Sequence, residues 1–213
     1  MTKRLLTLLT LAIVLQGSTG VAKTNIVNPA DFDVAGVRLG MTPEEARTAL
    51  ASSGFSIGSD SMADSWNARV ATEAGKFVNT PKDNTRAVYA TEAEGPEYQK
   101  VEVIYEITAT GSRAKKVEYS RPGEQGSIIA LAKAKYGEPT KAHLNFMRYC
   151  VEKKGCLDFA YSDSLGPSLY VYASFSGRST VTLSQGSAAD SRWKYAFESA
   201  VRTIAPKYGE ANF

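Results

Sequence analysis

The side chains that could perform chemistry in this sequence are few and scattered. The 213 residues include a single histidine, His143, and no G-x-S-x-G, H-E-x-x-H or glycine-rich phosphate-binding motif. A hydrolase needs a nucleophile, a base and an orienting group in contact. Asp158 and Asp163 flank a tyrosine-containing segment and form the best carboxylate pair for glycosidase-type chemistry. We therefore expect no catalytic residues and no cofactor, and an unrecognised hydrolase is the third of three functional alternatives.

The two cysteines, Cys150 and Cys156, lie on either side of a short turn. Lys153-Lys154-Gly155 between them has the composition of a hairpin turn, in which glycine takes a positive φ. In an exported protein such a pair predicts a disulfide. A redox-active pair is the alternative, but that role usually needs Cys-x-x-Cys at a helix N-terminus. We expect no metal site, because two sulfurs and the distant His143 do not complete a tetrahedral zinc site.

Tyrosine is the residue type that points to binding. In the segment 168–175, apolar residues alternate with tyrosine and serine, so the two sets face opposite sides of a strand. The first set is Leu169, Val171, Ala173 and Phe175, and the second is Tyr170, Tyr172 and Ser174. The aliphatic side should pack under a helix, and the other side should present tyrosines that include one from a neighbouring strand. Tyrosine is enriched at protein interfaces. The alternative is that the C-terminal helix or the first half of the chain covers this second side. The predicted binding residues are Tyr149, Tyr161, Tyr170 and Tyr172.

The N-terminus has the layout of a secretory signal peptide. Lys3 and Arg4 precede an apolar run from Leu5 to Leu15, and Gly20-Val21-Ala22 supplies small residues for cleavage. The run is shorter than the roughly 20 apolar residues of a spanning helix, although an uncleaved N-terminal anchor is the alternative. No cysteine lies near the cut, so no lipid anchor is expected. We predict that residues 1–22 are removed and that the protein is periplasmic or secreted.

The charge of the remaining chain excludes some partners. The full sequence carries a formal net charge of +3, and loss of Lys3 and Arg4 with the signal peptide lowers it to +1. A nearly neutral chain gives no electrostatic reason to bind nucleic acid or an anionic membrane.

Helix signals open the first half of the chain. Thr42 is a good N-cap, Pro43 suits the first helical position, and Glu45 stands where it completes a capping box. This helix should end at Gly54. The spacing of Met62, Trp66 and Val70 predicts a second helix over about 62–74. A strand is then expected at 101–107, where apolar residues recur at every second position. A turn after it predicts a return strand at 116–120, and a further strand is expected ahead of these at 86–91.

The second half repeats this plan loosely and ends in a helix. A helix is predicted over 124–136, with Gly137 as its cap, and a C-terminal helix over about 189–205. The predicted fold class is α+β, with two loosely repeated units of helices packed on antiparallel sheet, over 23–122 and 123–213, plus the C-terminal helix. The strands predicted in this half are 143–151, 156–162, 168–175 and 179–185.

Gly40-Met41-Thr42, followed by Glu45, a second helix and three strands, resembles a known unit. It resembles the unit of the small outer-membrane lipoprotein of the β-barrel assembly machinery, and the unit found twice in β-lactamase inhibitor proteins. The segment 135–140, KYGEPT, resembles the helix-ending Gly-x-Pro element of the first family. The resemblance implies helices on one face of a sheet and a protein-binding role.

A protein-binding role is compatible with two functions, which are the first two of the three alternatives. The first is a non-enzymatic envelope scaffold or assembly factor whose partner is another envelope or secreted protein. The second is a proteinaceous inhibitor that inserts a loop into the active site of a secreted enzyme.

Overall fold

The computed structural model describes residues 28–123, 125–151, 156, 165–175 and 177–209. Several predicted features lie outside these residues: the signal peptide, the 153–155 turn, most of the 156–162 strand, Asp158, Asp163 and Tyr161.

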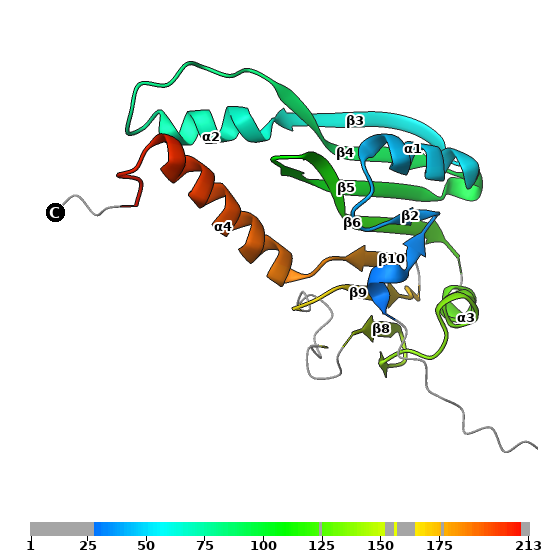
Figure 1. Cartoon of the computed structure of the whole chain (residues 1–213). Coiled ribbons are helices and arrows are strands. Elements are labelled where there is room, and N and C mark those ends of the chain that lie inside the picture. Colours follow the sequence, from blue (N-terminus) through cyan, green and yellow to red (C-terminus); the bar gives the residue numbers. More distant parts are fainter. Residues whose placement is uncertain (1–27, 124, 152–155, 157–164, 176, 210–213) are drawn as a thin grey trace, which may run out of the picture.

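The centre of the described fold is a single sheet of eight antiparallel strands (Figure 1). The first four in sheet order come from the first half of the chain, the last four come from the second half, and the two groups join where Val117 lies opposite Leu183. In sheet order the strands are β3 (Ser56–Asp64), β4 (Arg86–Glu94), β5 (Lys100–Thr108), β6 (Gly111–Pro122), β10 (Arg178–Ser184), β9 (Ser168–Tyr172), β8 (Phe146–Cys150) and β7 (Lys141–Ala142).

Helices and a small hairpin pack around this sheet. The predicted α+β class is confirmed, with helices on an antiparallel sheet and a helix at the C-terminal end. The elements are α1 (Pro43–Ser52), α2 (Trp66–Ala74), α3 (Gln125–Tyr136), α4 (Ser187–Ile204), the β1 (Asp33–Val34) and β2 (Val37–Arg38) hairpin, and the 3-10 turns η1 (Pro29–Asp31) and η2 (Pro96–Tyr98). None of the described helices is long and apolar enough to cross a membrane.

The predicted start of α1 is confirmed in detail. The Thr42 hydroxyl accepts a hydrogen bond from the Glu45 amide at 3.2 Å, and the Glu45 carboxylate accepts one from the Thr42 amide at 2.8 Å. Pro43 occupies the first helical position, where no amide donor is lost. Ala46 and Leu50 are fully buried on the sheet side of the helix. The local sequence therefore sets both where α1 begins and which side it buries.

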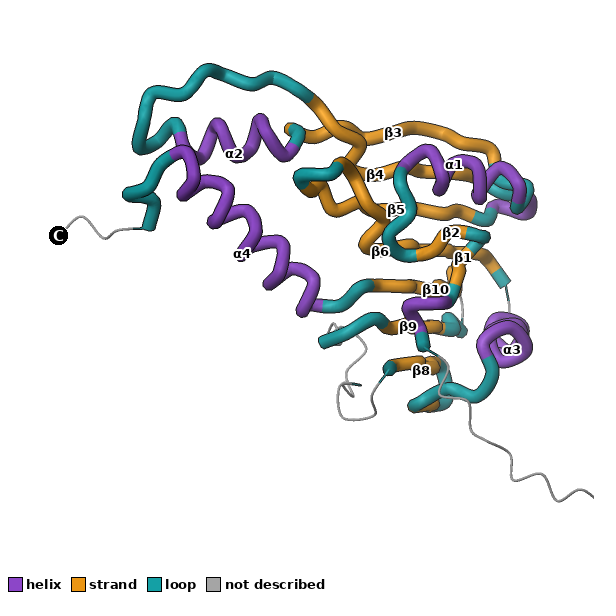
Figure 2. Tube along the Cα trace, in the orientation of Figure 1, coloured by secondary structure: helices purple, strands orange, loops and turns teal. Residues whose placement is uncertain are grey.

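One face of the sheet, which we call the core face, carries the main hydrophobic core. α1, α3 and the β1–β2 hairpin cover it, and Figure 2 shows α1 and the hairpin lying over the strands. The strand residues of this core alternate along the chain, as the two-residue period requires. They include Val101, Val103 and Tyr105 of β5, Leu169 and Val171 of β9, and Val181 and Leu183 of β10.

The prediction of a helix beginning at residue 62 is wrong. Residues 56–64 form β3, and Met62 is a strand residue, 48 % exposed, opposite Val88. The helix begins after Ser65, whose hydroxyl accepts a hydrogen bond from the Ala68 amide at 3.2 Å. β3 is an edge strand whose residues are almost all exposed, so it has no alternating apolar pattern that could reveal it.

A second hydrophobic cluster joins α2 and α4 at one end of the sheet. Trp66 and Val70 of α2 pack with Val201 of α4 and with Ile107 of β5. Trp193 contributes its ring to the cluster and donates a hydrogen bond from its indole nitrogen to the Ile107 carbonyl at 2.7 Å. Figure 1 shows α4 running from β10 to α2, away from β8 and β9. The C-terminal helix therefore closes the end of the sheet.

The predicted disulfide joins Cys150 and Cys156, whose Cα atoms lie 5.6 Å apart. Both residues are buried, and Cys150 is the last residue of β8. So short a closed loop stabilises by roughly 2 kcal/mol in the chain-entropy model. The bond therefore fixes the chain locally after β8.

Candidate functional site

The candidate binding site lies on the sheet face opposite α1 and α3, which we call the polar face. Strand register places its side chains in rows across the sheet. One row joins Arg148, Tyr170 and Thr182, and then continues through Glu118 and Glu102 to Glu92. The polar face therefore has an aromatic half on β8 and β9 and an acidic half on β4, β5 and β6.

The aromatic half is built from side chains that hold one another in place. The Tyr170 ring lies 5.8 Å from the Phe146 ring, and the Arg148 guanidinium lies 5.1 Å from the Tyr170 ring centroid. His143 stacks on Phe146 at 4.5 Å. Tyr170 and Tyr172 are half-buried, so each combines an ordered ring with surface that a partner can reach. Such rigid aromatic anchors are favoured in protein interfaces.

The acidic half brings like charges directly opposite one another. Glu102 of β5 lies between Glu92 of β4 and Glu118 of β6 in register. Only Glu118 of these three has an ion pair within the described part of the chain, with Lys116 at 3.0 Å. Carboxylates facing each other across strands destabilise a sheet. Glu92 and Glu102 are exposed, which limits that cost and leaves them accessible to a cationic partner.

The four predicted tyrosines do not share one surface. Tyr170 and Tyr172 lie on the polar face and Leu169 and Val171 on the core face, as the alternation predicted. Phe175, predicted to share the core face, follows the end of β9 and is 68 % exposed. Tyr149 does not, because it lies opposite Leu169 and therefore points to the core face. Tyr161 lies outside the described residues. The aromatic residue that completes this half of the site is Phe146, which lies opposite Tyr172.

Tyr149 is a core residue, and this corrects its assignment to a binding surface. It is 2 % exposed, and its ring packs against Phe32 and Tyr136. Its hydroxyl donates to the Gly137 carbonyl at 2.9 Å, and burial together with the nearby Glu138 charge raises the pKa of Tyr149 to about 12. The residue thus ties β8 to the end of α3.

A hydrogen-bonded chain of polar side chains was not foreseen from the sequence. The buried Tyr105 hydroxyl donates to the Thr91 hydroxyl at 3.1 Å, and Thr91 donates to an Asp60 carboxylate oxygen at 2.6 Å. Arg47 of α1 pairs with the other Asp60 oxygen. Each member is bonded to the next, and Tyr105 and Thr91 are shut off from solvent. The network is suited to fixing α1 on the sheet.

Neutralising Asp60 should reveal its contribution to stability. Burial raises the pKa of the Asp60 carboxyl, but hydrogen bonds from Thr91 and Arg47 and the Arg47 charge outweigh burial and hold that pKa below its usual value. The stabilisation is therefore present above the unfolded-state pKa of about 4 and is lost as the pH falls through the lower folded-state pKa. Asp60→Asn should cost about 1 kcal/mol near pH 7, and the difference from the natural protein should shrink below about pH 4.

Urea unfolding over a pH series measures this difference. Asp31→Asn, which changes an exposed carboxyl of η1, should shift the free energy of unfolding by less than about 0.5 kcal/mol. An Asp60→Asn difference that stays constant down to about pH 3 would contradict the role of the charged carboxylate.

The described residues contain no candidate metal centre. Within the described ranges, no group of three or more His, Cys, Asp or Glu side chains is placed to hold a metal ion. His143 is exposed and its ring partner is Phe146. The chain matches no family model, no curated protein and no solved structure.

Proposed function

We propose that this chain is an exported, non-enzymatic protein-binding module, an envelope scaffold or assembly factor whose polar face engages another envelope or secreted protein. The composition of residues 1–22 supports export, as does the buried disulfide, which is typical of oxidising compartments. The observation that carries the binding role is the contrast between the two faces of one sheet. Helices cover the core face, while the other face presents ordered aromatic rings beside a row of glutamates.

The chemistry of the polar face indicates what it would bind. Aromatic rings contribute much of the binding energy at many interfaces, and rows of one charge guide the approach of the opposite charge. The partner should therefore present apolar or aromatic side chains to Tyr170 and Tyr172 and basic side chains to Glu92 and Glu102. The resemblance to protein-binding units, carried by Gly40-Met41-Thr42, agrees with this role.

A loop at the end of two interior strands supports the inhibitor alternative. Tyr98, in the turn between β4 and β5, is 82 % exposed and has a φ of 61°, while Glu97 before it has a φ of 54°. Positive φ is strained for such residues and is often found at functional loops. Arg178 donates to the Tyr98 carbonyl at 2.6 Å and holds the turn. Stoichiometric inhibition of a secreted enzyme that is lost in Tyr98→Ala would identify this alternative.

Capture from an envelope extract tests the proposed function. The tagged protein should retain a specific partner, and reversal of charge in Glu102→Lys should reduce that capture severalfold, because it removes attraction for a basic surface. Glu138→Lys is the matched control, since Glu138 is a highly exposed glutamate whose ion pair is with Lys133 of α3, away from the polar face. Equal capture by both variants would contradict a role for the acidic half, and capture of nothing would contradict the proposal.

A further inference from the structure

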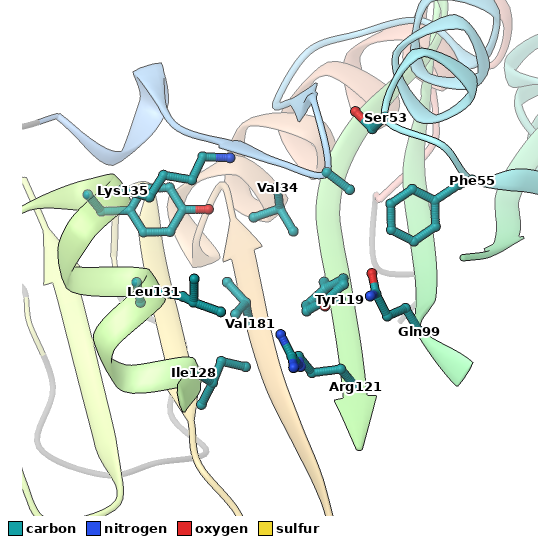
Figure 3. Close-up of a pocket in the computed structure, with 13 residues that line it drawn as sticks. Val34, Ser53, Phe55, Gln99, Tyr119, Arg121, Ile128, Leu131, Lys135 and Val181 are labelled. Carbon is teal, nitrogen blue, oxygen red and sulfur yellow. The ribbon is translucent and has the colours of Figure 1, made fainter. Parts of the chain in front are cut away.

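A cleft opens on the core face, between α3 and the turn that follows α1 (Figure 3). It has a volume of about 270 Å³. β6 and β10 form its floor through Tyr119 and Val181, while Phe55 forms one wall and Ile128 and Leu131 of α3 form the other. The cleft exists because α1 and α3 each cover one half of the sheet and the β1–β2 hairpin covers only part of the space between them.

The charged side chains that line the cleft are all basic. Lys135 and Arg121 both line it, and no carboxylate does so within the described residues. Lys135 is already neutralised, since its ammonium donates to Asp33 at 2.7 Å. Arg121 has no ion pair in the described part of the chain; its Nε lies 3.5 Å from the Pro122 carbonyl, and its side chain is also placed to hydrogen-bond the Tyr119 hydroxyl. Figure 3 shows the Arg121 guanidinium pointing toward Ile128 and Val181. Among the described residues, the cleft therefore combines apolar walls with one positive charge that has no ion pair.

We propose that this cleft binds a small amphipathic anion, a single-chain carboxylate of medium length such as decanoate. The guanidinium of Arg121 would hold the carboxylate through paired hydrogen bonds, for which its planar geometry is suited. The alkyl chain would lie against Ile128, Leu131 and Phe55, where burial of apolar surface favours binding. Leu131 is 55 % exposed at the edge of the cleft and would gain burial from the ligand.

The size of the cleft limits the ligand class. Drug-sized ligands occupy pockets of about 300–1,000 Å³, so a cleft of about 270 Å³ suits one short chain and excludes a two-chain lipid. Because the cleft and the polar face lie on opposite sides of the sheet, this proposal does not depend on the proposed partner binding. Failure of one would leave the other unaffected.

Calorimetric titration of the purified protein with decanoate, below the concentration at which decanoate forms micelles, tests the proposal. We expect saturable binding with one site per chain. Decanol has the same alkyl chain without the charge and should bind at least about tenfold more weakly than decanoate. The reason is that hydrogen bonds between charged groups are stronger than hydrogen bonds to a neutral hydroxyl. Arg121→Gln should weaken decanoate binding about tenfold and leave decanol binding unchanged. Leu131→Asp should weaken decanoate binding by a similar factor, by placing a negative charge at the edge of the cleft.

Matched variants outside the cleft separate this effect from changes in net charge or folding. Arg192→Gln and Ile204→Asp change an exposed arginine and a partly exposed apolar residue of α4, and both should bind decanoate like the natural protein. Circular dichroism spectra identical to that of the natural protein would show that each variant is folded. Decanol binding as tight as decanoate, equal weakening by Arg192→Gln, or no saturable binding of decanoate by the natural protein would each overturn the proposal.

Discussion

Replacing Trp66 by alanine should lower the free energy of unfolding by about 3–5 kcal/mol, the range for removing a large aromatic side chain from a core. Trp66 is 9 % exposed, and its ring makes edge-to-face contacts with Trp193 at 5.8 Å and Phe197 at 5.6 Å. These contacts join α2 to α4, which the chain reaches more than a hundred residues later. Without the indole, a cavity would remain between the two helices.

Denaturant unfolding followed by circular dichroism measures this loss. The chain has two tryptophans, so in Trp66 variants the fluorescence of Trp193 reports directly on the cluster. Trp66→Phe is the matched control and should cost clearly less, because a ring would still contact Trp193 and Phe197. A loss below about 1 kcal/mol for Trp66→Ala would contradict the role of this cluster in holding α4 to the fold.

Changing Tyr170 and Tyr172 together to serine should weaken partner binding by about 2 kcal/mol or more, roughly thirtyfold, if both act as anchors of the polar face. The stability cost should be smaller, about 1–2 kcal/mol, because both side chains are half-buried and Tyr170 loses its contacts with Phe146 and Arg148. The effect on binding should therefore exceed the effect on folding.

Paired measurements of unfolding and of affinity for the captured partner separate these effects. Tyr195→Ser is the control, since Tyr195 of α4 is an exposed tyrosine away from the polar face, and it should change neither quantity appreciably. A loss of several kcal/mol in stability with unchanged affinity would show that the two tyrosines belong to a second core layer. In that case the partner surface would have to lie elsewhere on the chain.

The sequence by itself determined the features that depend on residues close together in the chain. The start of α1 follows from Thr42, Pro43 and Glu45, whose hydrogen bonds span three residues. The placement of Tyr170 and Tyr172 on the side opposite Leu169 follows from the two-residue period of any strand. The short spacing of the two cysteines likewise brought them within disulfide distance.

Tertiary structure alone decided the features that depend on register between distant strands. Tyr149 lies in the core because the register of β8 on β9 places it opposite Leu169. A shift of the register by one residue would place the Tyr149 side chain on the polar face. The β3 residues are almost all exposed, so the strand buries no apolar side and its sequence shows no two-residue apolar period. Its pairing with β4 identifies it as a strand. The row of glutamates, the Asp60 hydrogen-bonded chain and the cleft at Arg121 also arise from pairing and packing between segments far apart in sequence. The local pattern determines which side of a strand a residue faces, whereas the pairing of distant strands determines whether that side is core or surface.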